Sequence, residues 1–331
     1  MTGPVALTLG DPAGIGGEIA LAAWKELRGR LVFFLIADPA HLREPAARLG
    51  VAIRAVAAPG EAASVAAEAL PVLPHPLPHA PVPGRPDPAN AAATIAIIAR
   101  GVELVRSGAA LALCTNPINK KVLIDGAGFA FPGHTEFLAH LSGAALPVMM
   151  LAAPGLRVVP VTIHIPLAAV PRALTPALLE ATLRITHRAL AADFGIADPR
   201  IAVAGLNPHA GEGGAMGREE IEVIGPVVAR LAAGGMRING PRSADTMFHP
   251  AARAGYDAAV CMYHDQALIP IKTVDFKRGV NVTLGLDFVR TSPDHGTAYD
   301  IAGRGIASPA SLIAALELAR DLGVTRAAGR R

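Results

Sequence analysis

Apolar positions form two kinds of pattern along the chain. Short apolar runs predict buried strands, and longer segments with apolar positions three or four residues apart predict amphipathic helices. The expected strands are residues 5–9, 31–36, 111–114, 157–161, 201–204 and 258–261. The expected helices are residues 18–27, 89–106, a helix from Pro176 with Thr175 as N-cap, 218–233 and 310–322. Strands and helices in alternation predict an α/β fold.

One segment interrupts this alternation. Residues 71–88 contain eight prolines, and proline lacks a backbone N–H and fixes φ. We therefore expect an extended surface or edge segment there and no regular helix. With 331 residues, the chain is long enough for about two domains of ordinary size.

Composition narrows the class of protein. Hydrophobic residues make up 52% of the chain, but no uninterrupted apolar run approaches the roughly 20 residues that span a bilayer. Residues 1–4 show no charged region ahead of an apolar one, so no secretory signal is expected. Cys114 and Cys261 are the only cysteines, and both lie in apolar runs, which predicts buried thiols. We expect a soluble, cytoplasmic protein without a membrane partner.

The charge does not indicate a nucleic-acid partner. The formal net charge is +3, yet the basic residues are scattered and cluster only at Arg326, Arg330 and Arg331. Aromatic residues make up 4% of the chain, which leaves few rings for base stacking. A solvated tail is the better interpretation of the terminal arginines.

Three histidines each follow one of the expected strands. His164 lies in TIHIP (162–166), His209 in NPHAGE (207–212) and His264 in MYHDQ (262–266). Ligands gather where the strands of open α/β sheets end, and three imidazoles can bind a divalent cation while leaving positions open for substrate. For any one histidine alone, a hydrogen-bonded core residue is the simpler interpretation. Together, with proline, glycine and acidic residues beside them, they favour a metal site.

A glycine-rich turn follows the first expected strand. Residues 10–18 read GDPAGIGGE, which resembles the start of a dinucleotide-binding turn. After Gly14 and Gly16, however, the third glycine of the GxGxxG fingerprint would fall at Ile19. No P-loop Gly-Lys-Ser/Thr occurs either. Any dinucleotide must therefore bind in a different way.

These motifs, with several others, resemble the 4-hydroxythreonine-4-phosphate dehydrogenase family of vitamin B6 biosynthesis. The resemblance runs in order from about Pro4 to Ala307. It departs from the family at Gly17, where proline is usual, and at Thr115-Asn116-Pro117, where an Ala-Pro pattern is common. The motifs that carry it are residues 10–18, 115–120 (TNPINK), 131–138 (FPGHTEFL), the three histidine motifs, 279–285 (GVNVTLG) and 290–298 (RTSPDHGTA).

The resemblance implies a fold similar to isocitrate and isopropylmalate dehydrogenases, with two α/β/α domains and a cleft between them. The cofactor-side domain would be discontinuous, comprising residues 1–125 plus 275–331. Residues 126–274 would form a metal and dimerisation domain. The family also implies a homodimer whose active site is shared between subunits, with His164 and His209 from one and His264 from the other.

The implied reaction is an oxidation that depends on NAD or NADP and on one divalent metal ion per site (Zn, Mg or Co). 4-Phosphooxy-L-threonine would be oxidised at its C3 hydroxyl to 2-amino-3-oxo-4-phosphooxybutanoate, because the metal lowers the pKa of that hydroxyl. Decarboxylation would then give 3-amino-2-oxopropyl phosphate on the route to pyridoxine 5'-phosphate.

The resemblance also assigns residues. His164, His209 and His264 would hold the metal. Asp245 and Asp265 are candidates for the general base, and equally for partners that orient a metal-bound imidazole; His134 is a third candidate base. The substrate ligands would be His134, Thr135, Lys272, Asn281 and Arg290, a set of cations and directional donors suited to a phosphate and a carboxylate. The cofactor-side residues would be Gly14, Ile15, Gly16, His295, Gly296, Thr297 and Asp300.

Three alternatives stay open. A sister dehydrogenase would act on 4-phospho-D-threonate, on its D-erythronate counterpart, or on a cyclic dihydrodiol acid. A metal-dependent phosphatase would use the histidines and carboxylates to activate water. A non-catalytic phospho-acid binding protein would keep its ligand affinity without the metal.

Overall fold

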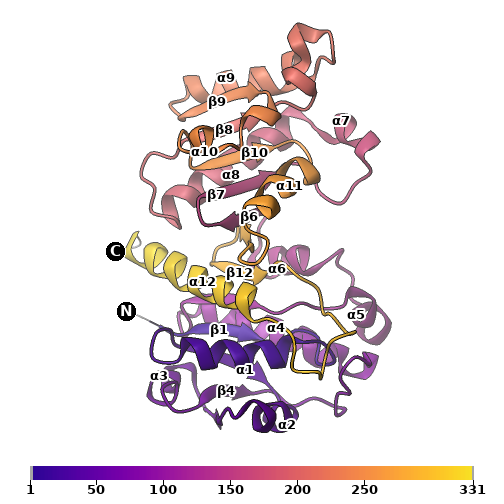
Figure 1. Ribbon diagram of the computed structural model, residues 1–331, viewed down its shortest axis with the longest axis vertical. Helices are drawn as coiled ribbons and strands as arrows, with labels where there is room; N and C mark the ends of the chain where they lie inside the picture. The colour runs from indigo at the N-terminus through magenta and orange to yellow at the C-terminus, as the bar shows by residue number, and fades with distance from the viewer. Residues whose placement is uncertain (1–2, 330–331) are drawn as a thin grey trace. The chain divides into compact units, whose positions relative to one another are not determined.

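The computed structural model describes residues 3–329 and divides into two compact units (Figure 1). Unit 1 comprises the chain up to Pro147 and again from Leu286, and unit 2 comprises Val148–Gly285. Residues 1–2 and 330–331 lie outside the described residues, so the predictions about a secretory signal and the terminal arginines partly fall there. The predicted α/β class is confirmed in both units.

The unit boundaries lie further along the chain than the 125/126 and 274/275 expected from the sequence. Helix α6 (His134–Ser142) contributes Phe137 and Leu138 to the hydrophobic cluster of unit 1, which keeps residues 126–147 there. Strand β11 (Val280–Leu284) pairs antiparallel with β6 (Val148–Ala153), which keeps residues 275–285 in unit 2. Because of the packing of α6 and the pairing of β11, the boundaries between the two units lie at 147/148 and 285/286.

Unit 1 contains a sheet with the strand order β3-β4-β2-β1-β5-β12, in which neighbouring strands are parallel. Parallel strands buried on both faces need helices on both faces. Its strands are β1 (Val5–Thr8), β2 (Phe33–Ala37), β3 (Ile53–Ala55), β4 (Leu70–Pro74), β5 (Ala112–Thr115) and β12 (Arg290–Pro293). Its helices are α1 (Gly16–Leu27), α2 (Pro39–Leu49), α3 (Ala62–Val65), α4 (Ala91–Arg106), α5 (Lys120–Ala127), α6 and α12 (Ala310–Gly329).

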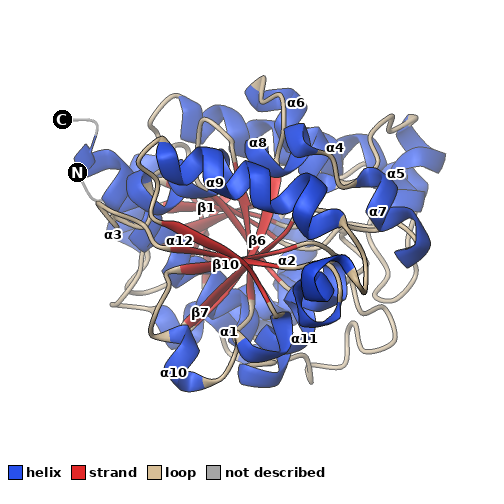
Figure 2. Ribbon diagram, turned by 90° about the horizontal axis from the view of Figure 1, so that it is seen from above, coloured by secondary structure: helices blue, strands red, loops and turns tan. Residues whose placement is uncertain are grey.

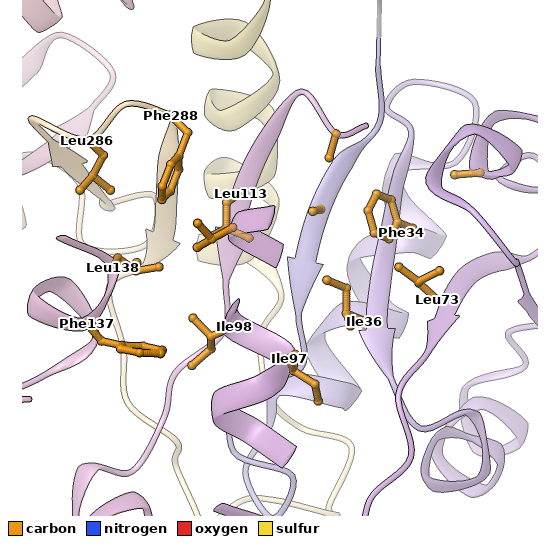
Figure 3. Close-up of a cluster of buried hydrophobic side chains, with 14 of the residues drawn as sticks. Phe34, Ile36, Leu73, Ile97, Ile98, Leu113, Phe137, Leu138, Leu286 and Phe288 are labelled. Atoms are coloured by element: carbon orange, nitrogen blue, oxygen red, sulfur yellow. The ribbon is translucent and has the colours of Figure 1, made fainter. Parts of the chain in front are cut away.

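Side chains alternate between the two faces of this sheet. Phe34 and Ile36 of β2 enter the hydrophobic cluster with Ile97 and Ile98 of α4 (Figure 3). Helix α12 packs against β5 and β12 without contributing to that cluster, and so lies on the opposite face. The helix is fastened there by a hydrogen bond from Thr291 Oγ1 to the Ala315 carbonyl (2.8 Å).

Helix α4 is unusually apolar for its length. Among the described residues, the segment Pro88–Arg106 passes as a possible membrane span by length and composition. Its Ile97, Ile98 and Val102 lie in the hydrophobic cluster of unit 1, which accounts for the apolar pattern as that of a core helix. The α-helix begins at Ala91, two residues later than expected, because Asp87 accepts from the Ala89 N–H and starts a 3₁₀ turn at Pro88–Asn90.

Unit 2 contains a sheet with the order β11-β6-β7-β10-β8-β9. Strand β6 pairs antiparallel with both β11 and β7, while β7, β10, β8 and β9 run parallel to one another. The remaining strands are β7 (Leu156–Pro160), β8 (Ile201–Ala204), β9 (Ile238–Arg242) and β10 (Ala258–Cys261). The helices are α7 (Val170–Ala173), α8 (Pro176–Ala192), α9 (Gly225–Ala233), α10 (Pro250–Arg253) and α11 (His264–Val274).

Helices again lie on both faces of the strands (Figure 2). Leu268 and Ile271 of α11 enter the hydrophobic cluster of unit 2, whereas the buried residues of α8 stay outside it. The predicted start of α8 is confirmed, because Thr175 Oγ1 accepts from the Leu178 N–H (3.2 Å).

The expected helix 218–233 is split. Residues Glu220–Ile224 form a π-helical turn before α9. Pro226 has no N–H to donate to the residue 222 carbonyl, which explains the wider register.

Candidate functional site

The three histidine loops of unit 2 emerge at one edge of its sheet. β10 pairs in parallel with β7 on one side and with β8 on the other. His164 follows β7, His264 is the first residue of α11 after β10, and His209 follows β8. The carboxyl ends of parallel neighbours meet at the same edge, so the topology places all three loops side by side.

Two of these histidines face each other. The ring centroids of His164 and His264 lie 5.7 Å apart. Both residues line a cavity of about 270 Å³ together with Thr162, Tyr263 and Asp265. Residues 3–329 of a single chain contain no group of three or more His, Cys, Asp or Glu side chains placed to hold a metal ion. His209 therefore lies on the adjacent loop and not in a completed three-ligand cluster.

Carboxylates orient two of the imidazoles. His209 Nδ1 lies 2.9 Å from Glu212 Oε2, and His264 Nδ1 lies 2.7 Å from Asp265 Oδ1. Such a pairing fixes the tautomer and leaves Nε2 available as a ligand. The hydrogen bond and charge of Glu212, and then the charge of Asp245, raise the pKa of His209. This donor set suits a divalent metal.

Side-chain bridges tie the three loops together. Thr162 Oγ1 donates to the Met262 carbonyl (2.8 Å), linking the His164 and His264 loops. Gln266 accepts from the Met262 N–H (2.6 Å) and donates to the Gly205 carbonyl (2.7 Å), linking the His264 and His209 loops. The sequence motif MYHDQ contains Gln266 but gave no indication of this bridging role.

Backbone geometry sets two of the loops apart. His164 has a φ of 52° and His209 a φ of 51°, a left-handed conformation that non-glycine residues rarely adopt. Such strain persists where surrounding contacts determine it, and it clusters at functional sites.

Lys272 lies on the same face of α11 as His264. The two are eight residues apart, and residues four and eight apart align along a helix. Both line a shallow cavity of about 390 Å³ with Asp265 and Ile269. Also in unit 2, Asn281 on β11 carries a buried Oδ1 with no hydrogen-bond partner in the described chain. A buried polar atom of this kind calls for an explanation, and a ligand is one.

Unit 1 contains the other predicted substrate residues. Arg290, the first residue of β12, is 4% exposed and donates from Nε (3.2 Å) and Nη2 (2.7 Å) to Thr115 Oγ1. Burial lowers the pKa of Arg290 to about 10, so it stays charged at neutral pH. The motif TNPINK contains Thr115 but does not indicate this role, which is to hold the guanidinium.

His134 is the first residue of α6, directly before the half-buried Thr135. Burial, and then the charge of Arg290, lower the pKa of His134 well below its ordinary value. Its Nε2 is buried and meets no hydrogen-bond partner within residues 3–329. A neutral imidazole beside a buried guanidinium can hydrogen-bond an anionic substrate without adding a second charge.

The glycine-rich loops of unit 1 also gather at one sheet edge, because β1, β5 and β12 are parallel neighbours. The Asp11 N–H donates to the Pro117 carbonyl (2.9 Å), and the Ile15 N–H donates to the Thr297 carbonyl (3.1 Å). Tyr299 donates from its hydroxyl to Asp11 Oδ2 (2.7 Å). The structure thus brings together the loops 10–18 and 295–303, which contain the predicted cofactor residues.

Gly14 permits this approach, and Gly16 lets the loop fold closely onto the end of β1. A Cβ on Gly14 would lie 2.9 Å from the Thr297 carbonyl oxygen, and one on Gly16 would lie 2.1 Å from that of Leu9. The other predicted cofactor residues differ in setting. Gly296 and Asp300 are exposed, while His295 has a buried Nε2 that finds no partner in the described residues.

A cavity of about 490 Å³ lies beside these loops in unit 1. Gly14 and Gly303 line it together with Glu18 and Arg48. Arg48 is paired with Glu18 (2.6 Å) and with Glu44 (2.9 Å). The cavity is large enough for part of a dinucleotide.

Comparison with known proteins decides the family. The family model described as "Pyridoxal phosphate biosynthetic protein PdxA" matches residues 30–319. The chain belongs to this family. A PdxA-family relative from Roseobacter denitrificans, named 4-hydroxythreonine-4-phosphate dehydrogenase, is 60% identical over 97% of each chain.

Solved structures agree with this membership. The crystal structure of 4-hydroxythreonine-4-phosphate dehydrogenase from Klebsiella pneumoniae is 38% identical, with a TM-score of 0.89 and 98% of each chain covered. A terephthalate 1,2-cis-dihydrodiol dehydrogenase from Burkholderia xenovorans is 32% identical, with a TM-score of 0.67, covering 96% of this chain and 98% of that one. The PdxA-family structure is therefore more similar than the dihydrodiol enzyme by both measures.

Proposed function

We propose that this protein oxidises 4-phosphooxy-L-threonine at its C3 hydroxyl, with NAD or NADP as hydride acceptor. The product, 2-amino-3-oxo-4-phosphooxybutanoate, loses carbon dioxide to give 3-amino-2-oxopropyl phosphate in pyridoxal phosphate biosynthesis. Family membership and the name shared by the relatives support this reaction. The observation that carries it is the row of His164, His264 and His209 loops at one sheet edge.

The histidines would hold a divalent ion such as zinc, magnesium or cobalt. When bound, this ion supplies Lewis acidity that lowers the pKa of the substrate hydroxyl. Glu212 and Asp265 orient the imidazoles of His209 and His264 through Nδ1. Asp265 pairs with His264, and Asp245 accepts from the Ser243 hydroxyl (2.5 Å), so both are proposed as candidates for the general base.

The substrate ligands proposed are His134, Thr135, Lys272, Asn281 and Arg290. Support comes from the chemistry of each residue. Arg290 is a buried cation, and Lys272 lines a cavity with His264. His134 and Asn281 carry buried polar atoms without a partner in the part of the chain that the structure describes.

The nicotinamide cofactor would bind along the unit 1 loops. Support comes from the close approach of the loops 10–18 and 295–303 and from the adjacent cavity of about 490 Å³. The residues proposed to contact it are Gly14, Ile15, Gly16, His295, Gly296, Thr297 and Asp300. The predicted cytoplasmic location stays a prediction.

We further propose a homodimer in which His264 of the partner subunit completes the site begun by His164 and His209. Large apolar side chains are exposed beside the histidine loops, namely Leu167 and Ile269 (67% and 63% exposed), and such exposure marks interaction surfaces. The close pair within one chain is His164 and His264, so the arrangement needs a direct test.

That test mixes inactive His209→Ala and His264→Ala proteins under conditions of subunit exchange. A shared site predicts recovered activity, because one of the two sites in each hybrid has all three wild-type histidines. No recovery after demonstrated exchange would mean that each site lies within one chain.

The reaction itself is tested with a substrate panel and NAD or NADP, after chelation and with zinc, magnesium or cobalt restored. We expect reduced nicotinamide to form from 4-phosphooxy-L-threonine only when a metal is present, and His209→Ala to abolish it. Preferential turnover of 4-phospho-D-threonate or of a dihydrodiol acid would favour a sister dehydrogenase. Release of inorganic phosphate without nicotinamide reduction would instead indicate a phosphatase.

Arg290 tests the phosphate assignment. Loss of a charge-assisted bond to a buried anion costs about 1.5–3 kcal/mol, roughly ten- to a hundredfold in kcat/KM. Arg290→Ala should therefore impair turnover of 4-phosphooxy-L-threonine far more than that of unphosphorylated 4-hydroxythreonine. Arg290→Lys should rescue only in part, since lysine lacks the planar fork. Equal losses on both substrates would assign Arg290 a structural role.

A further inference from the structure

The loop that carries His209 has a backbone that few sequences tolerate. His209, Ala210 and Glu212 have φ values of 51°, 52° and 42°, and the interspersed Gly211 and Gly213 are left-handed too. For residues with a Cβ this conformation is sterically disfavoured. Three such residues within four positions require contacts from outside the loop that determine the conformation.

The side chain of Glu220 supplies such contacts at the two residues that lead into the loop. Its Oε1 accepts from the N–H groups of Leu206 (2.7 Å) and Asn207 (2.8 Å), and its Oε2 accepts from Asn207 Nδ2 (3.0 Å). Glu220 is only 4% exposed. Charge-assisted bonds to a buried carboxylate are short and strong, so Glu220 fixes the entry to the His209 loop. Glu219 assists at Asn207 only, where its Oε2 accepts from the same Nδ2 (2.7 Å).

The loop is also packed tightly around this carboxylate. A Cβ on Gly211 would lie 2.6 Å from Glu220 Oε2, and a Cβ on Gly205 would lie 3.0 Å from Oε1. A Cβ on Gly217 would come within 2.3 Å of Asn207 Nδ2. Glycines at these positions let the backbone close on Glu220 and its partner Asn207 from several sides.

Glu220 opens the π-helical turn Glu220–Ile224. π-Helical turns are rare and occur frequently at functional sites. Here the turn is anchored at its first residue by the buried carboxylate, while Glu222, two residues later, pairs with Arg218 at the surface (2.6 Å). The two glutamates thus share one turn but differ in role.

We propose that Glu220 is a positioning residue for the metal ligand His209. By holding the left-handed loop, it fixes the direction of the His209 ring and of Glu212, which orients that ring through Nδ1. The inference rests on the proposed role of His209 as a metal ligand. Glu220 would act through His209 and would not itself contact the substrate or the ion.

The test is a cobalt(II) titration of the full-length protein, followed by calorimetry and by the visible spectrum of the bound ion. Loss of a residue that orients a metal ligand typically weakens binding by about 10- to 100-fold. We expect this loss in Glu220→Ala, with an altered spectrum. Glu222→Ala, the matched control on the same turn, should bind cobalt as wild type does.

Conservative variants separate positioning from a general loss of stability. Glu220→Gln keeps an oxygen for both backbone N–H groups but places its NH2 against the NH2 of Asn207, so its affinity should fall less than that of Glu220→Ala. Glu220→Asp is too short to reach both N–H groups and should behave like Glu220→Ala. Amide hydrogen exchange should speed up around residues 206–217 and remain unchanged in the strands.

Wild-type affinity and spectrum in folded Glu220→Ala would overturn the proposal, as would an equal loss in Glu222→Ala. If the alanine variant does not fold, Glu220→Asp decides by the same measurements. The His209→Ala variant is the reference for the metal site. Unchanged cobalt binding in that variant would refute the proposed metal role of His209, whatever the Glu220 variants show.

Discussion

The functional loops of the two units are held by different means. In unit 1, the loops after β1, β5 and β12 are joined mainly by backbone–backbone hydrogen bonds. The Asp11 N–H donates to the Pro117 carbonyl, and the Ile15 N–H donates to the Thr297 carbonyl. Gly16 allows the loop after β1 to lie directly on the Leu9 carbonyl. The sequence signal of such a loop is therefore glycine.

In unit 2, the loops after β7, β10 and β8 are joined mainly by side chains, beside one backbone bond from the Thr162 N–H to the Met262 carbonyl (3.2 Å). Thr162, Gln266 and Glu220 each bridge to a backbone group of a histidine loop. Polar residues that hold a loop look the same in a sequence as polar residues that perform chemistry. A glycine-rich motif therefore indicates where two backbone segments approach closely. A motif of polar residues does not by itself distinguish residues that hold a loop from residues that take part in the reaction.

The largest expected effect tests the backbone-held loops. In Gly16→Ala the new Cβ would lie 2.1 Å from the Leu9 carbonyl oxygen, so the backbone must shift. Overpacking typically costs 1–3 kcal/mol, and a clash with backbone belongs at about 3 kcal/mol or above. Gly60→Ala is the control, because its Cβ meets no described atom within 4 Å. Urea unfolding with equal midpoints for both variants would contradict the close approach.

The next effect tests the side-chain-held loops. Gln266→Ala removes both bonds of the bridge and leaves the Met262 N–H and the Gly205 carbonyl without it. An unsatisfied buried group costs about 1–3 kcal/mol, and we expect a loss of about 2 kcal/mol because the site is only partly buried. Thr273→Ala, at an exposed position of the same helix, should stay within about 0.5 kcal/mol. Equal unfolding free energies for the two would show that the bridge adds no stability.

How much the sequence reveals follows the same division. The strands 201–204 and 258–261 and the start of α8 were predicted correctly because apolar runs and an N-cap with proline are local signals. The position of His164, His209 and His264 at strand ends was likewise predictable from strand and loop patterns.

Long-range features were not predictable. The unit boundaries depend on the packing of α6 and the pairing of β11, which no local pattern records. The roles of Thr115 and Glu220 depend on groups far away in the sequence or on left-handed backbone in the loop. Pro226 is a sequence signal for the change of helical register before α9. The burial of Glu220 has no such signal, because it depends on how the His209 loop folds around that side chain.

A smaller effect concerns Asp11, a side-chain link within the backbone-held loops. Burial raises the pKa of Asp11, against the opposing hydrogen bonds from Tyr299 and the Ala13 N–H. A raised pKa in the folded state means that the folded protein binds this proton more tightly than the unfolded chain. The stability contributed is therefore present below about pH 3.9, the ordinary aspartate value, and is lost as the pH rises through the raised pKa.

The measurement is the unfolding free energy of wild type relative to Asp11→Asn across this pH range. As the pH rises, the unfolding free energy of wild type should fall relative to that of Asp11→Asn. The difference should become constant above the raised pKa. Tyr299→Phe removes a bond that lowers the pKa of Asp11, so the change should shift to higher pH. A difference that is constant from acid to neutral pH would show that Asp11 is not perturbed by its burial.

The smallest expected effect probes the strain of the His209 loop. Ala210 has a φ of 52°, and Ala210→Gly should relieve roughly 1–2 kcal/mol of steric cost while adding roughly 0.5–1 kcal/mol of lost entropy. The net result should be a gain of roughly 0–1.5 kcal/mol. Ala96→Gly, at an exposed position of α4, should instead lose about 1 kcal/mol, the usual cost of glycine in a helix. Because the two substitutions are chemically identical, opposite signs isolate the backbone conformation as the cause. A loss of similar size at both positions would mean that the loop is not held in the left-handed region.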